Sequence, residues 1–342
     1  MNDTDMMIEA MTRTEARRRE RRAFLGQSGA LVATAAGASL LAGCSSGNNN
    51  GGNGGDNVIV TPQPPILAPP QSGPLTDFDI LNFALQLEYL EAQFYAFAAT
   101  GAGLPNNLLT GSGIQGNVIG GRQVNFSDTL VGQYAREIAA DERAHVAFLR
   151  TALGNSAVTQ PTIDIDVKPT SAFSNAARAA GLIGPGQAFD VYANDENFLL
   201  GAFIFEDVGV TAYKGAAPLI TSPTLVEASA GILAAEAYHA GLIRTVLFAR
   251  GIQTPATIQA TEAISNARDS LDGASDLDQG VAPMASPFGT ASNIAPTNAS
   301  GLAFSRSAAQ VLNIVFLTNQ AAVMGGFFPN GLNGKIQTSA AN

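Results

Sequence analysis

The chain has 342 residues, of which 46% are hydrophobic and 13% charged, and its formal net charge is −10. This composition supplies enough apolar residues for a sizeable core and argues against global disorder. Six arginines lie within residues 1–43, and no basic stripe follows them. Binding to nucleic acid is therefore not expected.

The first segment, residues 1–43, is a predicted targeting sequence. Arg21 and Arg22 precede an uncharged run rich in Ala, Gly and Leu, which ends in Leu-Ala-Gly-Cys at Cys44. The arginine pair resembles the twin-arginine export signal, and the four residues resemble a bacterial lipobox, in which the cysteine receives lipid. We expect twin-arginine export and a lipid anchor on the periplasmic face of the envelope. Ser45 favours the outer membrane, and an uncleaved transmembrane anchor is the alternative.

Residues 44–76 form a predicted tether. A Gly/Asn-rich stretch is followed by a Pro-rich one, which indicates a flexible part and then a stiffer spacer. Cys44 is the only cysteine of the chain, so disulfides, iron–sulfur clusters and cysteine-bound iron sites are excluded.

Four long helices are predicted within residues 77–251, with a short helical piece near 171–180 in the connection between the second and the third. Their expected ranges are about 77–100, 127–153, 190–215 and 223–250. Proline at 223 suits a first helical turn, and glycines follow three of the helices. Two helical hairpins joined by a long crossover predict an all-α four-helix bundle.

The two histidines of the chain each follow a glutamate by three residues. Glu142 and His145 lie on the second predicted helix, and Glu236 and His239 lie on the fourth. Residues three apart share a helix face, so each pair points a carboxylate and an imidazole in one direction. This pattern is typical of a metal site in a helical bundle.

A second repeat lies on the first and third predicted helices, where Glu88 precedes Tyr95 and Glu206 precedes Tyr213 by seven residues. Seven residues are two turns, so each tyrosine lies on the face of its glutamate. The tyrosines either pack as core aromatics or hydrogen-bond to metal ligands. Glu91, one turn after Glu88 but rotated away, either supports a ligand or faces solvent.

Four inward-facing glutamates need compensation, because an ionised and unpaired buried carboxylate costs several kcal/mol. Two divalent cations would neutralise four carboxylates. Oxygen donors with two nitrogens and no sulfur favour iron or manganese, and zinc also fits. The alternatives are solvated helix faces for the glutamates and hydrogen-bonded core positions for the histidines. The predicted metal ligands, which are also the predicted catalytic residues, are Glu88, Glu142, His145, Glu206, Glu236 and His239.

Together these motifs resemble the signature of the ferritin-like superfamily of di-iron and di-manganese carboxylate proteins, over residues 77–251. Residues 252–342 are predicted to form a loop-rich extension that packs on the bundle, with a loop over 273–301 and a helix near 306–318. Within this extension AFSR at 303–306, QVL at 310–312 and GGFFPNG at 325–331 resemble the desiccation-related ferritin-like family.

The resemblance implies a non-cage ferritin-like domain with a stress-associated role. We expect a ferroxidase-like or manganese-catalase-like oxidoreductase that acts on oxygen or peroxide and protects against oxidative or desiccation stress. The alternative is a non-enzymatic protein of the envelope in which the metal is structural. The sequence is compatible with a homo-oligomer but not with a ferritin cage, whose subunit is much shorter.

Overall fold

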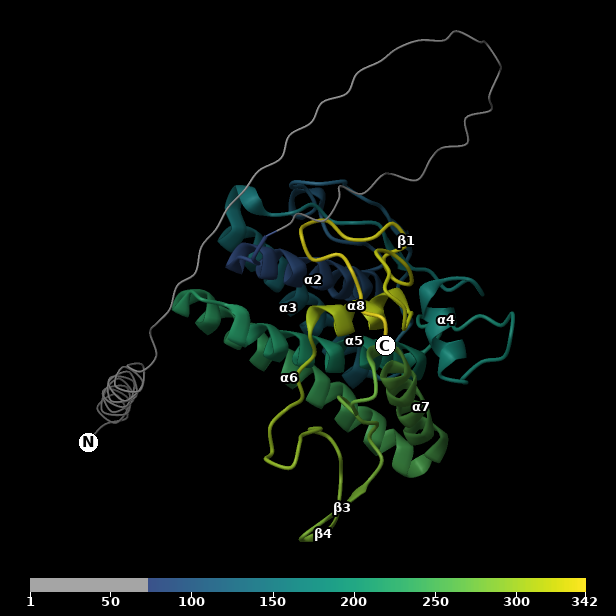
Figure 1. The fold of residues 1–342 in the computed structure, drawn as a ribbon. Helices are drawn as coiled ribbons and strands as arrows, with labels where there is room; N and C mark the ends of the chain where they lie inside the picture. Colours follow the sequence, from purple (N-terminus) through teal and green to yellow (C-terminus); the bar gives the residue numbers. More distant parts are fainter. Residues whose placement is uncertain (1–72) are drawn as a thin grey trace, which may run out of the picture. The chain divides into compact units, whose positions relative to one another are not determined.

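The computed structural model describes residues 73–342. The predicted export signal, Cys44 and nearly all of the predicted tether lie outside this range. The described part is mainly helical, with two short two-stranded sheets (Figure 1), so the all-α class is confirmed.

Four long helices form two antiparallel hairpins, and the predicted bundle with its long crossover is confirmed. Helices α2 and α3 pack together closely, as do α5 and α6, whereas α3 and α6 approach each other at few positions. The bounds of these helices are Asp77–Thr100 for α2, Thr129–Leu153 for α3, Asp195–Ala216 for α5 and Pro223–Gln253 for α6.

Side-chain caps set the helix ends. Thr76 and Asp79 form a reciprocal capping box at the start of α2, and Gly101 ends that helix at φ 79°, in the left-handed region that glycine tolerates best. The sequence predicted that the third long helix begins near residue 190, but α5 begins at Asp195. The reason is that the side chain of Asn194 accepts a hydrogen bond from the backbone N–H of Asn197 and so caps the helix there.

A small parallel sheet joins the α2–α3 connection to the crossover between the two hairpins. Strand β1, Val118–Gly120, comes from the α2–α3 connection and pairs with β2, Ile163–Ile165, from the crossover. The short helix α4, Ala172–Ala179, matches the helical piece predicted there. Single 3-10 turns lie at Asn106–Leu108, Gly154–Ser156 and Ala217–Leu219.

The C-terminal residues add two helices and a hairpin. Helix α7, Pro255–Asp272, was not predicted from the sequence; it starts two residues after α6 ends, with proline in its first turn. Strands β3, Met284–Ser286, and β4, Gly289–Ala291, form the antiparallel hairpin that projects from the helices in Figure 1. Helix α8, Ala308–Phe316, lies against α5 and α7.

A buried ion-pair network fastens these C-terminal residues to the bundle. Asp207 on α5 accepts hydrogen bonds from Arg244, at 2.8 Å, and from Arg268, at 3.2 Å. Such pairs persist in a protein interior only when their donors and acceptors are satisfied by one another. The members of the network are Asp207, Asp272, Asp278, Arg244, Arg268 and Arg306.

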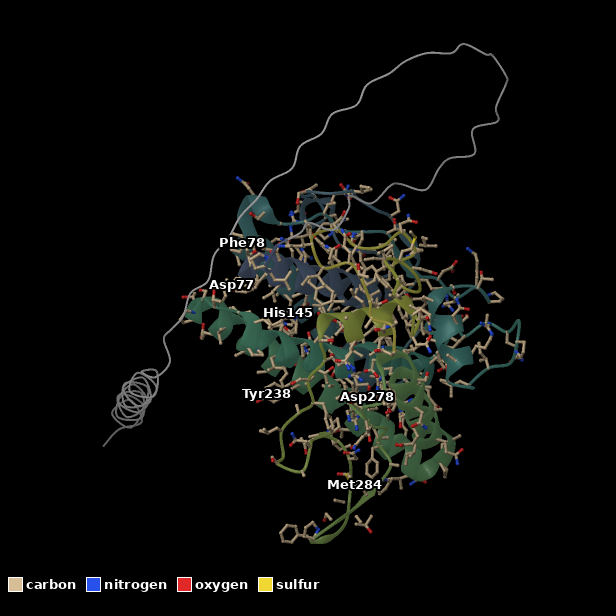
Figure 2. All side chains as sticks on the ribbon, in the orientation of Figure 1. Asp77, Phe78, His145, Tyr238, Asp278 and Met284 are labelled. Carbon is tan, nitrogen blue, oxygen red and sulfur yellow. The ribbon has the colours of Figure 1, made fainter. Side chains whose placement is uncertain are left out.

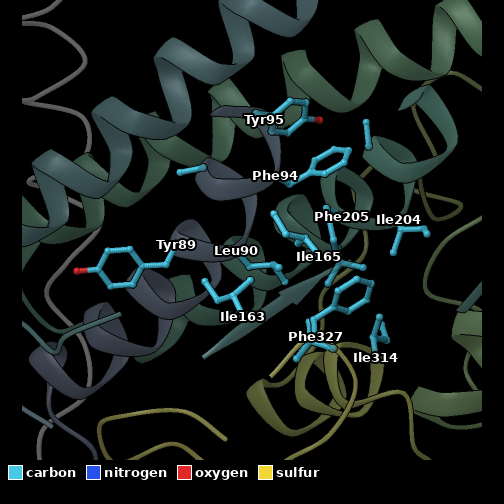
Figure 3. Packing of buried hydrophobic residues seen from close by; sticks show 14 of the residues in the cluster. Tyr89, Leu90, Phe94, Tyr95, Ile163, Ile165, Ile204, Phe205, Ile314 and Phe327 are labelled. Carbon is cyan, nitrogen blue, oxygen red and sulfur yellow. The ribbon is translucent and has the colours of Figure 1, made fainter. Parts of the chain in front are cut away.

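The hydrophobic core lies between α2 and α5 and is continued by α4, α8 and β2 (Figure 3). Phe94 is its centre, with ring centroids 5.4 Å from Phe173 and 5.6 Å from Phe205, and Phe327 from the C-terminal residues packs 4.9 Å from Phe205. Aromatic contacts of this kind add to the free energy of burial. They hold α2 and α5 in a fixed register, which the site described next requires.

Among the described residues, α6 alone is long and apolar enough to cross a membrane by length and composition. The same composition is expected of a helix that supplies one wall of a soluble bundle. Its buried charged residues, Glu236, His239 and Arg244, all contact other helices or loops of this structure.

Candidate metal centre

All six predicted ligands point into one buried cluster between the four long helices. The four glutamates are almost completely buried, and the side chains of His145 (labelled in Figure 2) and His239 are 11% and 6% exposed. Helix α2 supplies Glu88 and α5 supplies Glu206. The Glu-x-x-His pairs come from α3 and α6.

The cluster consists of two adjacent donor groups that share Glu142. One group contains Glu88, Glu142, His145 and Glu236, and the other contains Glu142, Glu206 and His239; within each group the donor atoms lie within 4.8 Å of one another. Nδ1 of His145 is 3.2 Å from Oε2 of Glu88, and Nδ1 of His239 is 3.1 Å from Oε1 of Glu142. Two ligands bound about 2.1 Å from one ion at right angles lie about 3 Å apart, so these spacings suit a common cation.

Unsatisfied polar atoms give an independent test of this fit. Eight buried atoms of the cluster have no hydrogen-bond partner: one oxygen each of Glu88 and Glu206, both oxygens of Glu142 and Glu236, and Nδ1 of both histidines. A buried acceptor without a donor costs about 1–3 kcal/mol, and native proteins contain few of them. Oxygen and nitrogen donors that converge without protein partners fit a metal ion, so this cluster could bind one.

The two predicted tyrosines hydrogen-bond to ligands of the opposite hairpin. The hydroxyl of Tyr95 on α2 donates to Oε1 of Glu206 on α5, and the hydroxyl of Tyr213 on α5 donates to Oε1 of Glu88 on α2. Burial, followed by the charge of the bonded glutamate, raises the pKa of each tyrosine well above its usual value, so both remain donors. Each bond holds one carboxylate oxygen and leaves the other free.

Asp141 is a candidate functional residue that the sequence analysis missed. Its side chain is 49% exposed, but its Oδ2 lies 3.2 Å from Nε2 of His239. A carboxylate at this position fixes the tautomer of a ligating histidine and leaves Nδ1 for the metal. In the sequence, only its position directly before the Glu142–His145 motif could have indicated this role for Asp141.

Glu91 and Gly209 complete the surroundings of the cluster. Glu91 is buried and does not face solvent, which removes one of the two roles left open for it. A Cβ added to Gly209 would lie 2.3 Å from Oε2 of Glu236 and 3.5 Å from Oε1 of Glu91. Glycine is therefore required at 209 for Glu236 to occupy its place. The seven-residue repeat could have identified Gly209, because this glycine lies between Glu206 and Tyr213 on the same helix face.

Without a metal the cluster retains protons. Burial, reinforced by the charge of Glu142, raises the pKa of Glu88 to about 7. Burial also opposes charge on the histidines, but the close carboxylates outweigh it and raise the pKa of His145 to about 11 and of His239 to about 9. Burial acts to raise the pKa of Glu142 as well, yet the two histidines lower it to about 2. In the metal-free protein, two protonated imidazoles therefore supply the positive charge that divalent cations would supply in the metal-loaded protein.

A groove of about 630 Å³ between α3 and α6 gives access to the cluster from one side. Its walls include Glu137, Asp141, His239 and Tyr238, which is 80% exposed and labelled in Figure 2. Because α3 and α6 pack against each other at few positions, this side of the bundle stays open. Acidic groups along the groove attract cations toward the ligands.

Much of the chain is similar in sequence to known proteins. The sequence model of the ferritin-like domain matches residues 76–249. The chain is 30% identical over 273 residues to the desiccation-related protein PCC13-62 of Craterostigma plantagineum, covering 77% of this chain and 84% of that protein. It is 27% identical over 272 residues to the ferritin-like catalase Nec2 of Nesocodon mauritianus, covering 76% of this chain and 84% of that protein. No solved structure is matched by the chain.

Proposed function

Because this chain belongs to the ferritin-like family, we propose that the cluster binds two divalent iron or manganese ions and that the protein breaks down hydrogen peroxide. The observation that carries this proposal is the pair of donor groups sharing Glu142, with eight unpartnered donor atoms. A relative named as a ferritin-like catalase and another named as desiccation-related support a protective role under oxidative or drying stress.

The donor set fits two ions rather than one. Glu142 has both oxygens unpartnered, one toward each histidine, so it could serve as a ligand to both ions. Glu236 also has both oxygens free, whereas Glu88 and Glu206 each offer one oxygen. Oxygen-rich sites with imidazole and no sulfur favour iron and manganese, and zinc remains compatible with the donors. When bound, two redox-active ions supply the two-electron chemistry that converts two molecules of peroxide into two of water and one of dioxygen.

The residues of the chain position ligands and carry protons in this scheme. Tyr95 and Tyr213 hold Glu206 and Glu88 in place, and Asp141 orients His239. One peroxide must lose two protons and the other must gain two. Glu91 is suited to this transfer because it is buried beside Glu236, is not in either donor group, and has a pKa raised well above its usual value, first of all by burial.

We also propose that the protein is exported by the twin-arginine route and anchored by lipid in the cell envelope. Arg21, Arg22 and Cys44 in the sequence support this proposal. Fractionation of the native host, with Cys44→Ser as the test variant, checks it: the wild-type protein is expected in the membrane fraction and the variant in the soluble periplasm. Equal distribution of the two proteins would contradict the lipid anchor.

The enzymatic proposal is tested with purified, metal-loaded protein and hydrogen peroxide, with oxygen evolution as the readout. Elemental analysis of protein from its native host first identifies the metal. Glu206→Gln is expected to lower the rate by about 100-fold or more because a ligand is lost. Glu227→Gln, an exposed glutamate on α6, is the matched control and should retain the wild-type rate within about twofold. Equal rates for wild type and Glu206→Gln at equal metal content would leave only a structural role for the metal.

A further inference from the structure

A second opening approaches the cluster from the side opposite the polar groove. It is an apolar pocket of about 50 Å³ between α2 and α5, beside α8. Five of its lining residues are labelled in Figure 3: Leu90, Ile204, Phe205, Ile314 and Phe327. Three of its lining residues are partly exposed: Ala84, Leu87 and Ala216.

The pocket is separated from the ligands by one layer of residues, and none of the six ligands lines it. Its lining includes Glu91, Gly209 and Tyr213. Tyr213 donates a hydrogen bond to the ligand Glu88, and Gly209 is the residue whose missing Cβ makes room for Glu236. Glu91 is buried and lies on the same side of Gly209 as Glu236. The pocket therefore ends at a carboxylate beside the cluster rather than in the hydrophobic core.

The size and chemistry of the pocket limit what it can hold. A water molecule needs about 10–15 Å³ on this measure, and a cavity of about 150 Å³ accommodates benzene, so 50 Å³ suits molecules of only a few atoms. Its walls are aliphatic and aromatic along most of their length, which disfavours ions and strongly polar molecules.

The pocket and the polar groove have no lining residue in common. The groove presents Glu137, Asp141 and His239, and it lies between α3 and α6. The pocket lies mainly between α2 and α5. Two cavities of opposite chemistry thus lie beside one cluster on different sides.

We infer that the apolar pocket is a dioxygen-binding site and the passage by which dioxygen reaches or leaves the cluster, while peroxide and cations use the polar groove. This inference rests on the proposed peroxide chemistry, in which two molecules of peroxide give two of water and one of dioxygen. Separate passages let the apolar product leave without displacing incoming peroxide from the groove.

Xenon is the first probe, because it binds apolar cavities of this size and its binding does not depend on turnover. Crystals of the metal-loaded protein are pressurised with xenon, and a xenon site is expected between Leu90, Val208 and Glu91. Ala84→Phe, which fills the pocket from α2, should lose this site. Ala152→Phe, a partly buried alanine on α3 that lines neither passage, should keep it. Absence of xenon from the wild-type pocket would overturn the inference.

Reaction rates provide the second measurement. Iron-loaded, reduced protein is mixed with dissolved dioxygen or with peroxide. Each dioxygen takes up two electrons from the reduced protein and two protons to give peroxide, and each peroxide takes up two electrons and two protons to give two waters. In Ala84→Phe with unchanged metal content, the ratio of the dioxygen rate to the peroxide rate should fall at least about tenfold. An unchanged ratio would overturn the inference.

These results are separable from the proposed function. If the wild-type protein evolves no oxygen from peroxide, the peroxide proposal fails, but the xenon site and the dioxygen rate still report on the pocket. If peroxide is broken down while xenon is absent from the pocket, the inference alone fails.

Discussion

Tyr95 on α2 donates a hydrogen bond to Glu206 on α5, across the interface between the two helical hairpins. Tyr213 on α5 returns the same contact to Glu88 on α2. The two hairpins therefore hold each other's ligands, and neither has a complete site alone. This exchange links assembly of the bundle to the placement of the carboxylates.

Tyr95→Phe should lower both stability and metal affinity. The substitution leaves Oε1 of Glu206 buried without a donor, which costs about 1–3 kcal/mol. Loss of a partner that orients a ligand lowers metal affinity by about 10–100-fold. Chemical denaturation and metal titration measure the two effects. Tyr238→Phe, at an exposed tyrosine, is the control and should change stability by less than about 0.5 kcal/mol. An equal response of the two variants would exclude a role for the Tyr95 bond.

The metal-free protein should lose stability as the pH rises from about 5 to about 8. The raised pKa values of Glu88, about 7, and Glu206, about 8, mean that the folded protein holds protons which the unfolded chain releases above about 4.5. The raised pKa of His239, about 9, acts in the same direction: its stabilising contribution is full below about 6.5 and is lost as the pH rises through 9. Glu142, with its pKa lowered to about 2, opposes this only below about pH 4.5.

Metal binding should reverse this pH dependence, because the ligands bind a cation only after they lose their protons. The stabilisation conferred by the metal should therefore grow with pH, and binding at neutral pH should release at least two protons per protein, one from each imidazole. Thermal melting of metal-free and metal-loaded protein over this pH range, together with calorimetry in two buffers, measures both quantities. Coincident melting curves after confirmed metal removal would show that the cluster is not linked to folding.

Gly209→Ala should weaken metal binding by displacing Glu236. The added Cβ would lie 2.3 Å from Oε2 of that ligand, so either the carboxylate or the helix must move. We expect a loss of metal affinity of about 10-fold or more. Gly231→Ala, on α6 with open space around the new Cβ, is the matched control and should stabilise the helix by about 0.4–1 kcal/mol. Unchanged metal titration of Gly209→Ala would contradict the requirement for glycine at 209.

Asp141→Ala should lower metal affinity without a large loss of stability. The carboxylate contacts Nε2 of His239 and is half exposed, so its removal frees the ring to rotate but leaves no buried charge behind. The expected loss of affinity is about 10–100-fold, as for other partners of metal-bound histidines. Glu137→Ala, which lines the same groove, should stay within about twofold of the wild type. Metal titration followed by spectroscopy of the loaded protein compares them.

The sequence by itself determined the four long helices of the bundle and the six side chains that they bring together, but not helix α7. Glu-x-x-His on two helices, with a glutamate on each of the two others, needs only the helical period to place each donor on one face. Apolar surroundings on those faces then required the donors to be buried. Both inferences use distances within one helix, which the residue spacing fixes.

Only the tertiary structure decided how the helices face one another. The exchange of Tyr95 and Tyr213 between hairpins, the contact of Asp141 with His239 and the burial of Glu91 all depend on the rotation and axial register of neighbouring helices. Helical periodicity gives the direction of a side chain about the axis of its helix, but it does not identify the residue of a neighbouring helix that the side chain contacts. That register is set by the aromatic core between α2 and α5 and by the buried ion pairs of α6 and α7, whose contacts join residues far apart in the chain.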